Sequence, residues 1–277
     1  MYNANYLKMF DRALHGISIG SNDGLKPFSS GGVLDHDGWY VTKFTRQKFR
    51  ASPPLGGEFV VTGKLVEALA CGTREVWDME MTNPPSEVKE IMYCSALVTI
   101  SKPDSVVPPD LLPLKPGPFE GGPGVTVAEQ TYTPYRDEYD FHLGSTHLPL
   151  QSALNLFERA RTDYLGGPDA LRQLKDKHNL IAVVTGIDKC ELVNLGHKKD
   201  ERDEEEADAG CRPGEAIAVK TYFLSKRRGR VIECRQTLLV SGTKRRRRLA
   251  QGIVTIMILE ADTRRPAKSI PKWLKEL

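Results

Sequence analysis

A histidine and a serine lie close together just before a stretch with helical periodicity. His147 follows Ser145 by two residues in "HLGSTHLPLQSALNLFERARTDYLGG", residues 142–167. Histidine titrates near neutral pH, so His147 could act as a general base or orient a water molecule, with Ser145 or Thr146 beside it. In the alternative interpretation, the hydroxyl caps the helix and the histidine lies at the surface. Both interpretations stay open at this point.

Two tracts of lysine and arginine could bind phosphate. They are "SKRRGR" at 225–230 and "KRRRR" at 244–248. Both are expected near tips of one antiparallel sheet, so we expect a single patch of about nine cations, suited to the 3′-phosphate of coenzyme A or to an RNA backbone. A solvated turn is the plain alternative. The candidate phosphate-binding residues are Arg227, Arg228, Lys244, Arg245 and Arg246.

Length and composition restrict the class of protein. The 277 residues suffice for one large domain or two smaller ones, and the net charge of +3 indicates no particular partner. Five cysteines without C-x-x-C spacing argue against a disulfide framework and a zinc site, which favours a reducing intracellular compartment, cytoplasmic or mitochondrial. No membrane span and no secretory signal is recognised. Neither a metal site nor a cofactor is predicted.

The chain contains two related units in tandem. Leu7, Phe10, Arg12 and Ala13 fall on Leu154, Phe157, Arg159 and Ala160 at an offset of 147. "GGEFVVTGKLV" (56–66) matches "PGEAIAVKTYF" (213–223) at an offset of 157, and "ALVTI" (96–100) matches "GIVTI" (252–256) at an offset of 156. Three matches in the same order with nearly constant offset indicate an internal repeat.

Each unit predicts one helix followed by antiparallel strands, an α+β arrangement formed twice. We expect a first repeat at 1–102, a Pro/Gly-rich linker at 103–123 and a second repeat at 124–277. The second repeat has a leading strand within 124–141, which the first repeat lacks. Either the start is trimmed, or the missing edge is supplied elsewhere. The strands are expected at 39–49, 58–69, 74–82, 91–101, 180–193, 215–225, 230–242 and 248–260.

The repeat resembles the hotdog fold of the 4-hydroxybenzoyl-CoA and acyl-ACP thioesterase superfamily. The similar segments are "NANYLKMFDRAL" (3–14), "THLPLQSALNLFERAR" (146–161) and the closing strand with its tail, "GIVTIMILEADTRRPAKSIPKWL" (252–274). The resemblance implies a double hotdog in which antiparallel β-sheet wraps two long helices. It also implies a ligand at the seam between the repeats, with the active site at a helix N-terminus.

The resemblance places the family's functional positions on this chain only in part. The catalytic carboxylate falls on Leu143 and the paired asparagines on Pro149 and Leu150, whereas Asn3 keeps one family asparagine. Leucine can neither activate water nor attack a carbonyl. Arg161 stands where some carboxylate-free hotdog thioesterases place a working arginine. The alternative is a helix-end cation that balances the dipole and pairs with an acid.

Two functions follow from these expectations. The first is hydrolysis of a fatty or aryl acyl thioester of coenzyme A or acyl-carrier protein, with His147, Ser145, Arg161 and Asn3 as site residues. The second is a catalytically inactive hotdog subunit for binding or assembly, for example in a ribonucleoprotein such as a mitochondrial ribosome. Its RNA contact would be the basic run at 244–248 together with the tract at 225–230. Homo-oligomerisation is compatible with either function.

Overall fold

The computed structural model describes eleven stretches of the chain, and all structural statements refer to them. The described residues are 9–10, 13–14, 40–51, 53, 57–68, 74–85, 90–101, 125–134, 148–192, 214–240 and 247–275.

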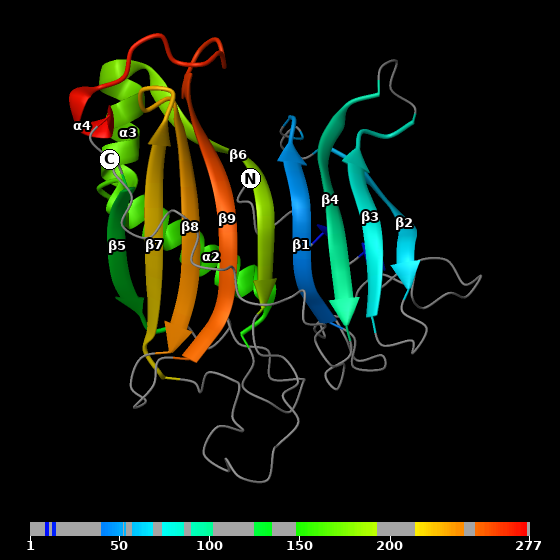
Figure 1. Cartoon of the computed structure of the whole chain (residues 1–277). Coiled ribbons are helices and arrows are strands. Elements are labelled where there is room, and N and C mark those ends of the chain that lie inside the picture. Colours follow the sequence, from blue (N-terminus) through cyan, green and yellow to red (C-terminus); the bar gives the residue numbers. More distant parts are fainter. Residues whose placement is uncertain are drawn as a thin grey trace.

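One nine-stranded antiparallel sheet dominates the structure (Figure 1). The strand order is β2-β3-β4-β1-β6-β9-β8-β7-β5. All eight strand segments expected from the sequence are present to within a few residues, because β-branched residues and period-two alternation mark them locally. The strands are β1 (Tyr40–Phe49), β2 (Val60–Ala68), β3 (Arg74–Thr82), β4 (Met92–Ser101), β5 (Val125–Tyr132), β6 (Leu180–Leu192), β7 (Ile217–Lys226), β8 (Val231–Val240) and β9 (Arg247–Glu260).

The strand order is symmetric about the pair β1–β6. On one side it reads β1, β4, β3, β2, and on the other β6, β9, β8, β7. The pairing across the join is symmetric too, since Lys43 pairs with Glu191 and Lys48 with Gly186. The two halves are therefore duplicates that join through β1 and β6, a place we call the seam. The exact domain limits stay a prediction.

A threonine bulge recurs at equivalent points of the two halves. The register of β1 against β4 shifts between Val41 and Lys43, which leaves Thr42 at the bulge. The register of β6 against β9 shifts between Val184 and Gly186, around Thr185. Each threonine hydroxyl donates to the carbonyl oxygen of a threonine on the neighbouring strand at 3.4 Å. Shared bulges are features of a fold rather than accidents of packing, so they support the duplication.

The helices differ from the expected pair of long helices. The described ones are α2 (Leu150–Tyr164), α3 (Gly167–His178) and the single turn α4 (Lys272–Lys275). The expected first central helix lies mostly outside the described residues; Met9, Phe10, Ala13 and Leu14 of it are helical. The described residues therefore do not show two long helices. No described helix is long and apolar enough to cross a membrane.

The short helix α3 was not predicted from the sequence. The paired glycines at the end of α2 were expected to end the helical region. Gly166 does turn the chain with φ 92°, and an added Cβ there would stand 2.8 Å from Cβ of Ala170. Pro168 then suits the first turn of a new helix, because its missing N–H would have no partner there.

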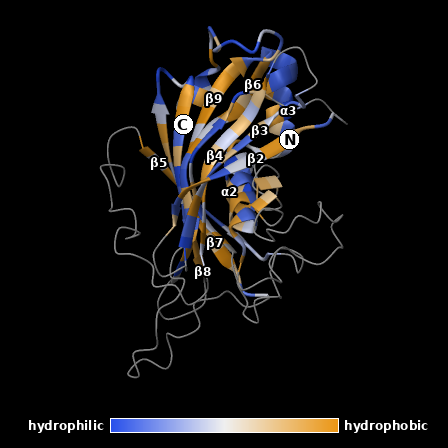
Figure 2. Ribbon diagram, turned by 90° about the vertical axis from the view of Figure 1, so that its right-hand side faces the viewer, coloured by the Kyte–Doolittle hydropathy of each residue, from blue (hydrophilic) through white to orange (hydrophobic). Residues whose placement is uncertain are grey.

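Helix α2 lies across one face of the second half of the sheet (Figures 1 and 2). Its apolar residues recur at helical spacing and are buried. Near the C-terminal end, the Tyr164 ring stacks on Phe223 of β7 with centroids 4.0 Å apart. In the middle, Phe157 lies against Gly252 of β9, where an added Cβ would stand 3.2 Å from the ring. Since α2 also contacts β6 and β1, its N-terminal end lies toward the seam.

The two outer edges of the sheet differ. In the second half, β5 is the leading strand expected from the sequence; it pairs with β7 along its whole length. Tyr132 of β5 donates a hydrogen bond to Asp163 of α2 at 2.6 Å. In the first half, no described strand pairs with the outer side of β2. Leu65 and Val66 on β2 are 44% and 57% exposed.

Candidate functional site

The first turn of α2 offers backbone donors near the seam. Pro149 is the N-cap residue, and its carbonyl accepts the N–H groups of Ser152 and Ala153 at 2.9 and 3.1 Å. The N–H groups of Leu150 and Gln151 have no acceptor within the helix, as at any helix start. Together with the positive end of the helix dipole, such groups can stabilise an oxyanion.

Three of the four predicted catalytic residues lie outside the described residues. They are His147, Ser145 and Asn3. The first described residue after His147 is Leu148, which is 5% exposed. The N-cap position is occupied by Pro149, which makes no side-chain capping hydrogen bond, whereas Ser145 and Thr146 lie outside the described residues. The capping interpretation given for their hydroxyls therefore stays a prediction.

Arg161 is buried between α2 and the sheet. It is 3% exposed, and its Nη1 donates to Oε1 of Gln236 on β8. The Gln236 amide in turn donates to the Phe157 carbonyl at 2.9 Å and to the Thr221 hydroxyl at 3.1 Å. Arg161 stands in the last turn of α2, as the helix-end interpretation requires, but its hydrogen-bond partner is an amide rather than an acid.

Burial controls the protonation of the groups around Arg161. Burial lowers the pKa of Arg161, and the nearby Glu158 partly offsets this effect. Burial raises the pKa of Glu158, which the charge of Arg161 partly reverses. The pKa of the Cys234 thiol rises to about 12 for the same reason, and Cys190 also has a raised pKa. The two thiols are therefore neutral and unreactive at ordinary pH.

Arg161 does not belong to one reaction centre with the start of α2. Eleven residues separate it from Leu150, which corresponds to about 16 Å along a helix. The guanidinium is also held to β8 by Gln236. The structure thus brings Arg161 together with Gln236, Thr221 and Glu158, and not with the N-terminal end of the helix.

The described members of the two basic tracts lie at opposite ends of β8. Arg227 and Arg228 are exposed at the turn that precedes β8. Residues 244–246 lie outside the described residues, whereas Arg247 and Arg248 of the same tract pair with Val240 and Leu239 at the other end of β8. A ten-residue strand is roughly 30 Å long, so the described residues of the two tracts belong to opposite ends of the sheet. The physical reason is that, in an antiparallel sheet, the turn before a strand and the turn after it lie at opposite ends of that strand.

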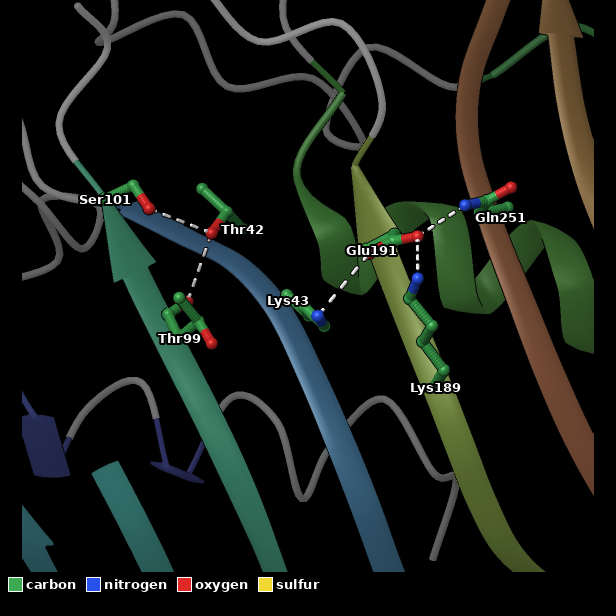
Figure 3. Close-up of polar contacts among 7 residues, drawn as sticks. All are labelled: Thr42, Lys43, Thr99, Ser101, Lys189, Glu191 and Gln251. Atoms are coloured by element: carbon green, nitrogen blue, oxygen red, sulfur yellow. Dashed lines mark hydrogen bonds and ion pairs between the residues drawn. The ribbon is translucent and has the colours of Figure 1, made fainter. Parts of the chain in front are cut away.

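A polar cluster at the seam was not found from the sequence (Figure 3). Glu191 of β6 is 1% exposed, accepts a hydrogen bond from Gln251 and lies 2.5 Å from Lys189 Nζ. Across the seam, Lys43 Nζ of β1 is 3.8 Å from the carboxylate. Cys190 faces α2, so the adjacent Glu191 faces the opposite side of the sheet. The cluster therefore joins the two halves and does not face the start of α2.

The sequence carried only a weak signal for Gln236. On β8 the buried phase is otherwise apolar, with Ile232, Cys234, Leu238 and Val240. A single glutamine in this phase indicates a buried amide that needs partners. No pattern along the chain connects it with Arg161, which is 75 residues away.

No protein-family model and no curated protein sequence matches this chain. A 12:0-ACP thioesterase from Umbellularia californica is similar in structure, with 10% identity over 93% of this chain and 87% of that one and a TM-score of 0.51. A tesB protein from Mycobacterium avium subs paratuberculosis has 7% identity over 93% of this chain and 87% of that one, with a TM-score of 0.47.

A 1,4-dihydroxy-2-naphthoyl-CoA thioesterase from Synechocystis covers 55% of this chain and 95% of its own, with 11% identity and a TM-score of 0.41. At such identities the likeness concerns the fold and not the activity. The symmetric strand order and the match to the Umbellularia enzyme agree with the resemblance noted in the sequence. The chain has the hotdog fold, in a tandem double form.

Proposed function

We propose that the protein binds acyl thioesters of coenzyme A or acyl-carrier protein near the start of α2 and hydrolyses them. The observation that carries the proposal is the position of the first turn of α2, whose backbone N–H groups lie toward the seam between duplicated halves. The fold that this chain shares with a 12:0-ACP thioesterase supports it by analogy.

In this proposal the side chains have different tasks. His147 activates water as a general base, and Ser145 holds that water by a hydrogen bond. Asn3 of the first repeat contacts the thioester from the other half. The N–H groups of Leu150 and Gln151 stabilise the oxyanion. Arg161 is a positioning residue, because it fixes α2 to β8 through Gln236.

The proposal is tested with a panel of acyl-CoA and acyl-ACP substrates. We expect turnover that falls roughly 100-fold or more in His147→Ala. His178→Ala is the control, since this exposed histidine ends α3 far along the chain from the start of α2. An Arg161→Lys variant should lower thermal stability together with kcat. Turnover that is undiminished in His147→Ala would refute the assigned chemistry.

A second candidate is a subunit that binds acyl thioesters without hydrolysing them. It is favoured by Pro149 and Leu150, which occupy the positions of the family's paired asparagines; Leu150 is 2% exposed and apolar. This function predicts that acyl-CoA raises the melting temperature while no free thiol is released. Release of thiol by the wild-type protein would exclude it.

A further inference from the structure

Two arginines occupy the central positions of the turn between β7 and β8. Gly229 N–H donates to the Lys226 carbonyl at 3.1 Å, and Arg227 and Arg228 have φ angles of 52° and 58°. Two positive φ angles characterise a type I′ turn, for which Asn and Gly are preferred. A residue with a Cβ is strained in this conformation. The tip thus carries two exposed arginines where the backbone favours other residues.

The C-terminal tail, residues 260–275, packs against this turn (Figure 1). Arg230 Nη2 donates to the Lys268 carbonyl at 2.8 Å. A Cβ on Gly229 would stand 3.3 Å from the carbonyl oxygen of Leu274 in α4, and Leu274 itself is fully buried. The tail is therefore held in place beside the turn. We call turn residues 227–230 and tail residues 260–275 together the basic end.

Positive charge predominates at the basic end. Its exposed cations are Arg227, Arg228, Arg230, Arg264, Arg265, Lys268, Lys272 and Lys275. The acids in the same segments are Glu260 and Asp262, which accept hydrogen bonds from Thr263 at 2.8 Å and from Asn179 at 2.7 Å. Trp273 of α4 is 41% exposed among these cations. A large aromatic ring left exposed in a cationic surface points to a ligand with flat rings and negative charge.

The size of the basic end indicates several phosphates rather than one. The tail meets the end of β6 through the hydrogen bond from Ala261 N–H to the Asn179 carbonyl at 2.7 Å, and it meets the β7–β8 turn at α4. The neighbouring strands β6, β9, β8 and β7 span roughly 15 Å at the usual spacing. This width exceeds the surface that a single nucleotide would cover.

We propose that the basic end binds single-stranded RNA, independently of the acyl-thioester function proposed above. The arginines and lysines neutralise phosphates, and Trp273 stacks on a base. An acidic protein surface would engage the cations but would not require the exposed ring. Arg247 and Arg248 of the other basic tract are not part of this site, because they pair with the opposite end of β8.

The test measures fluorescence anisotropy of a labelled oligouridine of about 12 nucleotides with the full chain at about 50 mM salt. We expect binding that weakens as salt rises. Arg227→Asn/Arg228→Gly installs the preferred turn residues, so the melting temperature is kept or raised while affinity falls roughly 10-fold or more. Lys48→Asn/Arg50→Gln, which removes two exposed cations from β1 and the residue after it, should leave affinity unchanged.

Trp273→Ala distinguishes stacking from charge alone. It should lower affinity about 5-fold or more with little change in the salt dependence, because the ring carries no charge. The proposal is overturned if the wild-type protein does not bind, or if the turn variant and the β1 control lose affinity equally. It is also overturned if poly-glutamate binds as tightly as RNA with no effect of Trp273→Ala, or if coenzyme A displaces the RNA.

Discussion

The two halves fill the space between helix and sheet differently at equivalent positions. Phe10 and Phe157 correspond at the offset of 147, and both are fully buried. One turn later, Leu14 in the first half corresponds to Arg161 in the second. On the sheet, Met79 corresponds to Gln236 at the offset of 157. The first half therefore packs two apolar side chains where the second has a hydrogen-bonded cation and amide.

This difference shows that the polar network is not required by the fold. A buried cation loses its hydration, and apolar residues of similar volume are often as stable or more stable in its place. The apolar arrangement of the first half is evidence that the same architecture accepts it. The network of the second half instead ties three points together, since Gln236 contacts Arg161, Thr221 and the mid-helix carbonyl of Phe157. The network holds α2 against the sheet at Phe157 and Arg161. It thereby also helps to hold the first turn of α2 near the seam.

The largest effect is expected when the network is cut on one side. Gln236→Met leaves the Arg161 guanidinium buried without its partner, so the free energy of unfolding should fall by about 3–5 kcal/mol. Arg161→Leu/Gln236→Met, which copies the first half, should restore stability to within about 1–2 kcal/mol of wild type. Urea unfolding measures both. Equal losses in the single and double variants would contradict the idea that the two halves are interchangeable here.

A smaller effect is expected at the seam. Glu191→Ala leaves Lys43, Lys189 and Gln251 without their shared carboxylate, and should cost about 2–3 kcal/mol. Because Lys43 pairs with Glu191 and Lys48 pairs with Gly186, Lys48 occupies on β1 the position that Glu191 occupies on β6. Lys48 is exposed. Lys48→Ala should change stability by less than about 0.5 kcal/mol. Chemical unfolding of both variants measures the two losses in the free energy of unfolding. Equal losses would contradict the idea that Glu191 on β6 stabilises the seam more than Lys48 on β1.

The buried thiols predict how stability responds to alkaline pH. Burial raises the pKa of Cys94 in the first half and of Cys234 in the second to about 12. Above pH 9 an unfolded cysteine ionises while the folded one stays neutral, so stability falls between about pH 9 and 12, by up to about 1.4 kcal/mol per pH unit for each thiol. Cys94→Ala and Cys234→Ala should each reduce this slope by a similar amount. An unchanged slope would mean that these thiols ionise equally in both states.

The smallest effects concern the repeated bulge. Thr42→Val and Thr185→Val each remove one hydroxyl that bonds a backbone carbonyl, at about 0.5–1.5 kcal/mol. Thr42 also contacts the Ser101 hydroxyl at 3.2 Å, so its substitution should be the costlier of the two. Thermal unfolding checks the order. The reverse order would show that the two bulges are not energetically equivalent.

The sequence alone determined the strands, the helix α2 and the duplication. Alternating β-branched residues located the strands, and the spacing of apolar residues located α2. The offset of 157 matched β2 to β7, and the offset of 156 matched β4 to β9. These patterns involve residues that are close together along the chain, so they can be recognised in the sequence itself. The start of α2 was harder to locate, because the hydroxyls of Ser145 and Thr146 suggested an N-cap residue, whereas the N-cap position is Pro149.

Only the tertiary structure decided where distant residues meet. It joined β1 to β6, buried Arg161 against Gln236, and set Glu191 on the side of the sheet away from α2. It also separated Arg247 and Arg248 from the β7–β8 turn by the length of β8, and it brought the tail with Trp273 to the turn that carries Arg227 and Arg228. The physical reason is that burial and strand pairing depend on residues far apart in the chain, whereas the periodicity of apolar residues depends on neighbouring residues.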